Sequence, residues 1–254
     1  PVDRNTIFQV SSLSKFVTAA GIMKLTEQGK IDLDTPVNNY LKRWKLPASA
    51  FDNEQVTVRR LLSHTAGLTD GLGYNGFENR DSVQSLEASL TKAKDVDEGI
   101  SGEVKVGIAP SSAWKYSGGG FTLLQLIVEE TSGQSFNDFM TSNIFKPLNM
   151  NSSTYILSDS LNSRLCEFYH ADKTTAPHYY YTSLAATSLY TSLADLETYF
   201  QIFLKGKNGE PIGRGQLKPE SLKLIRTGHW NIMGEEIYGL GSMLYIDIEE
   251  NEDI

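Results

Sequence analysis

Cysteine is almost absent from this sequence, since Cys166 stands alone among 254 residues. One thiol cannot close an internal disulfide, which excludes a small disulfide-held scaffold. A chain of this length needs no such bridge, because it buries roughly 70–75% of the surface that its unfolded form exposes. The hydrophobic share of 40% and the charged share of 21% are ordinary for a globular protein, which excludes the disordered and fibrous classes.

Long apolar runs and basic blocks are missing as well. No apolar run approaches the ~18–20 residues that span a bilayer, so the sequence predicts no membrane span in this chain. Lysine and arginine number 23 against 31 acidic residues, and no dense basic cluster offsets the net charge of −8. This balance excludes phosphate-driven binding of nucleic acid. The expected partner is a small-molecule or short peptide substrate, and the sequence leaves the oligomeric state open.

The chain opens at Pro1, without a Met and without a charged and then apolar signal segment. We therefore expect it to be a processed or trimmed piece of a longer protein. A single cysteine is compatible with the periplasm, the exterior and the cytoplasm alike, so composition does not choose the compartment.

The spacing of apolar residues predicts a mainly helical chain. Between Ser11 and Gly29 they recur at three- and four-residue steps, which indicates an amphipathic helix with serine N-cap oxygens and a left-handed glycine at its end. Residues 70–112 carry scattered glycines with weak periodicity, typical of a long surface excursion that forms the wall of a site. Further helices are predicted near 37–41, 82–93, 121–130, 136–144, 193–204 and 219–225, with a strand over 237–248.

Ser12 and Lys15 form the first candidate for chemistry. They lie three residues apart at the start of the first predicted helix, so their side chains share one face. The positive end of the helix dipole favours the alkoxide character that a serine nucleophile needs. The same pattern also occurs by chance as an ordinary N-cap serine followed by a solvated lysine.

Tyr116 is the second candidate. It precedes the glycine-rich start of the helix predicted over 121–130, where a turn projects a phenol that can donate, accept or move a proton. Taken alone, it is better interpreted as a packing tyrosine, one of 12 in the chain.

The combination of motifs resembles a known family. The Ser12-x-x-Lys15 pattern is followed by the run Leu61-Leu62-Ser63-His64-Thr65-Ala66-Gly67-Leu68 and then by Tyr116-Ser117-Gly118. In this order and at these separations, the chain from about Ile7 to Ser242 resembles the serine β-lactamase-related family of penicillin-binding-type hydrolases, in its class C-like branch.

The resemblance implies an α+β fold of the β-lactamase/transpeptidase type, with a helical lobe and an antiparallel sheet lobe, as a single catalytic domain over residues 1–254. It implies a serine hydrolase that acts through an acyl-enzyme on amide, lactam or ester bonds. Ser12 would be the nucleophile, Lys15 its partner and Tyr116 the second proton-handling group. No metal and no organic cofactor is implied, and the family points to the bacterial periplasm or the exterior, with the cytoplasm left open.

The identity of the general base stays open at this point. A neutral lysine at pH 7 costs roughly 4.6 kcal/mol and an ionised tyrosine roughly 4 kcal/mol, from ordinary pKa values. This difference is smaller than the perturbation that any site imposes, and two groups sharing one proton titrate as a pair.

Two departures from the family pattern shape the prediction. Gly118 stands where the family commonly has Asn, whose amide contacts the acylamide side chain of β-lactams, and this favours an esterase or peptidase over an efficient β-lactamase. The third motif, Lys-Thr-Gly or His-x-Gly on a strand after Tyr238–Gly241, does not occur before Ile254. We therefore expect a sheet truncated at both chain ends and a missing oxyanion-hole donor. A non-catalytic peptide- or penicillin-binding module of the same fold is the alternative.

Four other patterns are interpreted structurally. His64 is expected to make buried hydrogen bonds, and His170 and His178 to be solvated loop residues whose spacing fits no zinc site. Arg226-Thr227-Gly228 imitates Lys-Thr-Gly but closes a helical stretch. Gly118-Gly119-Gly120 lacks the preceding strand of a dinucleotide site and indicates the start of a helix.

Overall fold

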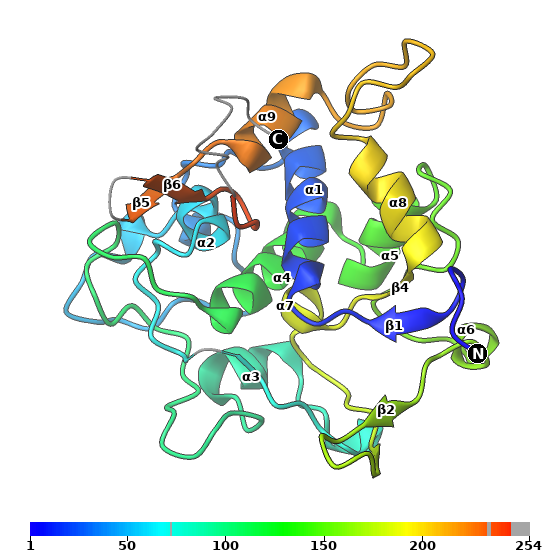
Figure 1. Cartoon of the computed structure of the whole chain (residues 1–254). Helices are drawn as coiled ribbons and strands as arrows, with labels where there is room; N and C mark the ends of the chain where they lie inside the picture. Colours follow the sequence, from blue (N-terminus) through cyan, green and yellow to red (C-terminus); the bar gives the residue numbers. More distant parts are fainter. Residues whose placement is uncertain (72, 233–234, 245–254) are drawn as a thin grey trace.

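The architecture is known from a computed structural model that describes residues 1–71, 73–232 and 235–244. Helix α1 (Leu13–Glu27) runs through the middle of the molecule (Figure 1). It ends where Gly29 adopts a φ of +67°, as predicted. The prediction of a serine N-cap is wrong. The Ser12 side chain makes no capping hydrogen bond and instead contacts two side chains of the site described below.

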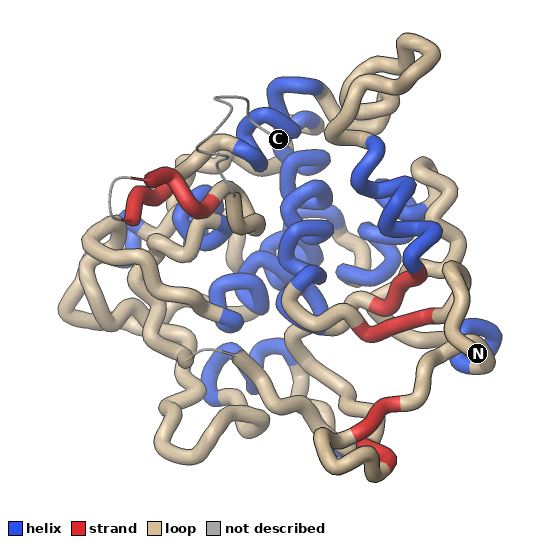
Figure 2. The backbone as a smooth tube through the Cα atoms, in the orientation of Figure 1, coloured by secondary structure: helices blue, strands red, loops and turns tan. Residues whose placement is uncertain are grey.

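Helices surround α1 on several sides, and loops make up most of the periphery (Figure 2). Most predicted helices are confirmed, with bounds that differ by a few residues. The helix predicted near 37–41 is a 3-10 turn. The helix predicted over 136–144 is divided into α5 and the π-helical turn η4. The helices are α2 (Val58–Leu62), α3 (Leu86–Lys92), α4 (Gly118–Ser132), α5 (Phe136–Met140), α6 (Asp159–Asn162), α7 (Leu184–Thr187), α8 (Leu193–Gln201) and α9 (Pro219–Arg226), with turns η1 (Val37–Asn39), η2 (Asn53–Gln55), η3 (Arg80–Ser82) and η4 (Thr141–Phe145). No helix among the described residues is long and apolar enough to cross a bilayer.

The strands are short, and each pairs with one antiparallel neighbour. β1 (Ile7–Gln9) pairs with β4 (Tyr190–Ser192), β2 (Phe168–Tyr169) with β3 (Thr175–Ala176), and β5 (Trp230–Ile232) with β6 (Glu235–Tyr238). Helices with small antiparallel sheets confirm the α+β class. Within residues 1–71, 73–232 and 235–244 these pairs are separate sheets and do not join into one sheet lobe.

The strand predicted over 237–248 is confirmed only for residues 237–238, the end of β6, and is wrong over the rest of its described part. β6 ends at Tyr238, and the chain turns back so that Met243 bridges Tyr238. Gly241 allows this turn because it adopts a φ of +81° and lies against the backbone of α1, where a Cβ would sit 2.9 Å from the Lys15 carbonyl oxygen. Residues 245–248 lie outside the described part of the chain.

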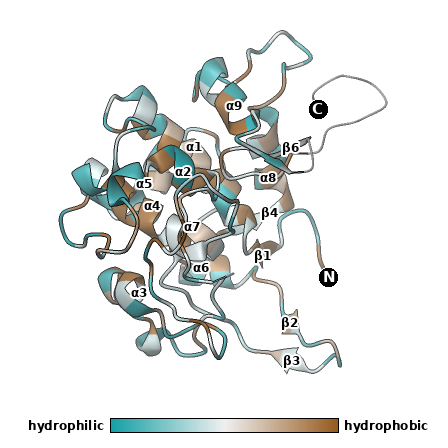
Figure 3. Ribbon diagram, turned by 90° about the vertical axis from the view of Figure 1, so that its left-hand side faces the viewer, coloured by the Kyte–Doolittle hydropathy of each residue, from teal (hydrophilic) through white to brown (hydrophobic). Residues whose placement is uncertain are grey.

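The core forms where α1 packs against α4 and α7. Most apolar side chains of these helices are fully buried, and Phe16 and Leu184 are partly buried. Burial of this kind stabilises a fold by about 25 cal/mol for each Å² of apolar surface removed from water. α3 and the β2–β3 hairpin lie at the opposite end of the molecule from α9 (Figures 1 and 3). The start of α1 and the start of α4 are thereby fixed on a rigid core.

Candidate active site

Ser12 lies exposed at the N-terminus of α1, directly after Ser11, whose φ of +46° turns the chain into the helix. Its hydroxyl is contacted from two sides. The Lys15 ammonium donates to Ser12 Oγ at 3.1 Å, and the Tyr116 hydroxyl donates to the same oxygen at 2.7 Å. The structure therefore brings together all three residues that the sequence analysis selected, although they come from segments 104 residues apart.

Lys15 is buried, with only 3% of its surface exposed, because the helix places it one turn inside the core. Its ammonium also donates to the Ala186 carbonyl oxygen at 2.7 Å, and it lies 4.8 Å from the centroid of the Tyr116 ring. Burial lowers the pKa of Lys15 to about 7, against the opposing attraction of the Asp70 carboxylate. A large neutral fraction, able to accept a proton, is therefore present at neutral pH.

Tyr116 is half-buried in the turn before α4. Its ring packs against the ring of His64 at a centroid distance of 4.4 Å. Burial raises the pKa of the phenol, while the hydrogen bond to Ser12 opposes this shift. Tyr116 is thus a protonated hydrogen-bond donor at neutral pH, which matches its contact with Ser12 Oγ.

Ser117, the next residue, is held by two side chains from the segment after α2. Its backbone N–H donates to His64 Nδ1 at 3.2 Å, and its hydroxyl donates to Asp70 Oδ1 at 2.5 Å. The second carboxylate oxygen of Asp70 accepts from the Gly119 N–H at 2.7 Å, and Ser117 Oγ accepts from Gly120 N at 2.8 Å. We call this set of bonds the Ser117 clamp, and it fixes the turn that carries Tyr116.

The buried hydrogen-bonding role predicted for His64 is confirmed. Burial, together with the positive charge of Lys15, lowers the pKa of His64 to about 3. The ring is therefore neutral at ordinary pH, and its Nδ1 remains an acceptor for the Ser117 N–H. Asp70 was not selected from the sequence, where its only signal is a position at the start of the glycine-rich excursion.

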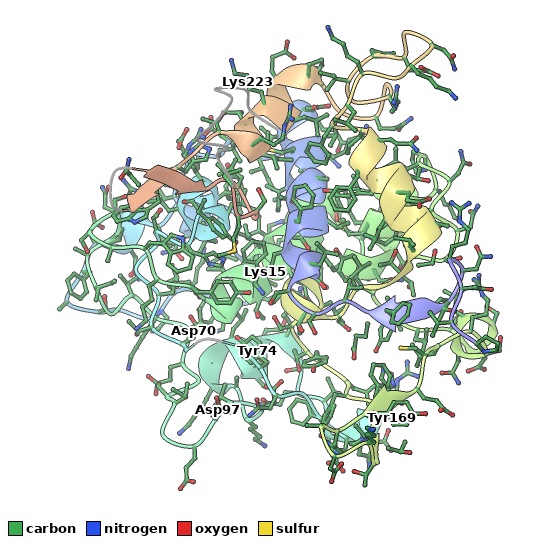
Figure 4. The ribbon with its side chains drawn as sticks, viewed as in Figure 1. Lys15, Asp70, Tyr74, Asp97, Tyr169 and Lys223 are labelled. Atoms are coloured by element: carbon green, nitrogen blue, oxygen red, sulfur yellow. The ribbon has the colours of Figure 1, made fainter. Side chains whose placement is uncertain are left out.

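A small cavity opens beside Ser12. It encloses about 190 Å³ and combines the nucleophile candidate with two tyrosines that the sequence analysis did not select. Its lining residues are Ser11, Ser12, Lys15, Gly73, Tyr74, Gly118, Tyr181, Ala186 and Thr187. Figure 4 shows Tyr74 and Asp70 close to Lys15, near the start of α1.

The remaining predictions for individual residues are mostly confirmed. Arg226 ends helix α9, and Gly118 begins α4, as expected. His170 is exposed, but the solvated state predicted for His178 is wrong. His178 is half-buried, bonded to the Tyr190 hydroxyl at 2.6 Å and stacked on Phe168. The described residues contain no group of three or more His, Cys, Asp or Glu side chains that could hold a metal ion.

Solved structures share this architecture. The chain is similar to the octameric penicillin-binding protein homologue from Pyrococcus abyssi, with a TM-score of 0.74 and 28% identity over 96% of this chain and 55% of that one. A D-stereospecific amidohydrolase from Streptomyces sp. matches 93% of this chain and 70% of its own with a TM-score of 0.69, and at 21% identity it shows the fold alone. The protein therefore has a β-lactamase/transpeptidase-like fold, as the motifs implied.

Sequence comparison identifies the family. A family model described as Beta-lactamase matches residues 1–247, so the chain belongs to the Beta-lactamase family, whose members are serine hydrolases. Penicillin-binding protein 4* of Bacillus subtilis (strain 168) is 33% identical over 210 residues, which is 83% of this chain and 42% of that protein. Protein flp of Staphylococcus aureus (strain NCTC 8325 / PS 47) is 27% identical over 59% of this chain and 28% of its own length. The chain spans less than half the length of these curated relatives.

Proposed function

We propose that this chain is a serine hydrolase that forms an acyl-enzyme on Ser12. The observation that carries the proposal is the pair of hydrogen bonds on Ser12 Oγ, from Lys15 at 3.1 Å and from Tyr116 at 2.7 Å. A nucleophile within hydrogen-bond reach of a proton acceptor is the arrangement that covalent catalysis requires. Membership of a serine hydrolase family supports the same assignment.

Lys15 is the proposed proton acceptor for acylation. In its neutral form it keeps a donor for the Ala186 carbonyl and a lone pair for the Ser12 proton, while Tyr116 donates to Ser12 Oγ. The serine oxygen then bonds to the substrate carbonyl carbon, and its proton moves to Lys15. The proton then passes from Lys15 through Tyr116 to the leaving group as its bond to the carbonyl carbon breaks, which completes acylation. Water attacks the ester in the second half-reaction, releases the acid and restores the serine hydroxyl.

Esters and short peptides are the proposed substrates, in preference to β-lactams. Gly118 offers no side-chain amide at the cavity wall, so the acylamide group of a penicillin or cephalosporin finds no amide partner there. A p-nitrophenyl ester should accordingly show a higher kcat/KM than nitrocefin, a chromogenic cephalosporin. A nitrocefin value above the ester value would reject this preference.

Covalent labelling tests the central assignment. A fluorophosphonate probe should modify the chain once, and peptide mass spectrometry should place the adduct on Ser12. The Ser12→Ala variant should lose the adduct, whereas Ser11→Ala, one residue away in the same cavity, should retain it. Labelling that survives Ser12→Ala contradicts the proposal, and a stable penicillin adduct without turnover of any ester would favour the non-catalytic binding module.

A further inference from the structure

Tyr74 occupies the space beside Gly118 at the start of α4. A Cβ built on Gly118 would lie 3.0 Å from Cε2 and 3.3 Å from Cδ2 of the Tyr74 ring, which is closer than ordinary van der Waals contact. The phenol ring, which comes from the excursion over residues 70–112, therefore fits closely against a residue without a side chain, and a Cβ at position 118 would push the ring by a few tenths of an ångström. The two residues form a matched pair.

The Tyr74 ring is held in this position by a polar network. Its hydroxyl lies 3.3 Å from Thr122 Oγ1, on the first turns of α4. Thr122 Oγ1 is 3.1 Å from the Gly118 carbonyl oxygen and 2.5 Å from Ser183 Oγ. Helix and loop both contribute to this network, which adds to the close contact with Gly118 in positioning the ring.

A second tyrosine, Tyr181, lines the same cavity. Its ring packs on Gly76, where a Cβ would lie only 2.7 Å from Cε1 of the ring. Among the described residues that line the 190 Å³ cavity, Lys15 is the only charged one, and its ammonium is already bonded to Ser12 and Ala186. In the described part of the chain, the space next to the nucleophile is thus flanked by two phenol rings and contains no free cation for an anionic acyl group.

We propose that Tyr74 determines the acyl specificity of Ser12, and that the preferred substrates are esters or amides whose acyl group carries a flat apolar side chain such as an aryl ring. This inference rests on the proposed function and adds the substrate class to it. Aromatic rings gain from offset or edge-to-face packing on one another in addition to the surface they bury. A cavity of about 190 Å³ beside Ser12 has room for one such ring.

A pair of esters with the same leaving group tests the assignment. The ratio of kcat/KM for p-nitrophenyl phenylacetate to that for p-nitrophenyl acetate reports the acyl preference, and dividing the ratio of a variant by that of the original chain cancels the intrinsic reactivities. Tyr74→Ala should lower this ratio about 10-fold, from the loss of one aromatic packing partner and its apolar surface. Tyr74→Phe should keep the ratio, because the ring remains.

Two further variants separate specificity from folding. Gly118→Ala should also lower the ratio, because the new Cβ displaces the Tyr74 ring without removing it. Tyr169→Ala is the matched control, since Tyr169 is 58% exposed on β2 and far from Lys15 and Tyr74 in Figure 4. It should leave the ratio unchanged. Thermal unfolding of each variant confirms that the ratios compare folded proteins.

The possible outcomes test the specificity role of Tyr74 separately from the proposed serine hydrolase activity. If both esters are hydrolysed and Ser12 is labelled, but Tyr74→Ala and Gly118→Ala leave the ratio unchanged, the specificity assignment is overturned and the serine hydrolase stands. If the original chain hydrolyses neither ester and forms no adduct at Ser12, the proposed function is wrong and the inference falls with it. A lowered ratio in both variants and an unchanged one in Tyr74→Phe and Tyr169→Ala support it.

Discussion

Lys15 lies in the first turn of α1, and its ionisable amino group is buried there. Burial lowers the pKa of Lys15 from its ordinary value of 10.5 to about 7, whereas burial raises the pKa of Tyr116 above its ordinary value of 10.0. At neutral pH the lysine is therefore neutral in a large fraction of molecules, and the tyrosine is not ionised. This contrast favours Lys15 as the base, a choice that ordinary pKa values alone leave open.

The lowered pKa makes stability depend on pH. The unfolded chain binds a proton on Lys15 up to about pH 10.5 and the folded chain only up to about 7, so stability rises with pH between these values. Relative to Lys15→Met, the original chain should gain about 3 kcal/mol of unfolding free energy between pH 6 and pH 9. Urea unfolding of both proteins at the two pH values measures this. Parallel changes in the two proteins would contradict a pKa near 7.

The start of α4 depends on side chains outside the helix. The helix begins with Gly118, Gly119 and Gly120, and glycine is about 1 kcal/mol less favourable than alanine in a helix interior. The Ser117 clamp offsets this weakness, because Asp70 and Ser117 accept the N–H groups of Gly119 and Gly120. One buried carboxylate thus supports both the helix start and the turn that carries Tyr116.

Asp70→Asn should therefore change stability and catalysis together. Ser117 and Gly119 bond different oxygens of the carboxylate, and an amide has only one acceptor oxygen, so we expect the free energy of unfolding to fall by about 1–3 kcal/mol. Removing the negative charge that raises the pKa of Lys15 should also move the rising limb of the kcat/KM profile to lower pH. Asp97→Asn is the control, because Asp97 is exposed on the same excursion (Figure 4). A limb that stays in place would contradict the coupling of Asp70 to Lys15.

Signals local in sequence predicted the helices and the serine–lysine pair. Gly29 and Gly133 both follow helices and both adopt left-handed backbone, with φ of +67° and +71°. Ser12 and Lys15 share a helix face because they are three residues apart. Such features depend only on neighbouring residues, so periodicity and the glycine signal for a helix end were sufficient, although the serine N-cap predicted for α1 was wrong.

Contacts between distant segments were beyond those rules. Asp70 lies 47 residues from Ser117, and Tyr74 lies 48 residues from Thr122, within an excursion that has no readable periodicity. His178 was predicted to be solvated because nothing near it in sequence indicates the Tyr190 hydroxyl, which β4 places beside it. These contacts follow from packing of the whole chain.

The candidate catalytic residues lie at the starts of α1 and α4, two helices whose residues are mostly buried. Ten residues of α1 and eleven of α4 are buried, and both helices pack on α7. At the periphery, α6 has no buried residue at all. Local stability should follow this difference, since opening a segment that buries little surface requires little free energy.

Hydrogen exchange measured by mass spectrometry tests this gradient. Amides in peptides from α1 and α4 should exchange most slowly, near the rate set by global unfolding, while those of α6 should exchange fastest among the helices. A peptide from α9, which buries three residues, should be intermediate. Protection of α6 equal to that of α4 would contradict the assignment of a single rigid core around α1.

The close fit between Gly118 and Tyr74 also has an evolutionary consequence. A side chain gained at position 118 while Tyr74 is present meets the ring at 3.0 Å, whereas a smaller residue gained first at position 74 leaves room for the second change. The two substitutions are therefore epistatic, and the order in which they occur decides whether the intermediate is strained. Lineages that alter this wall of the cavity should change position 74 before, or together with, position 118.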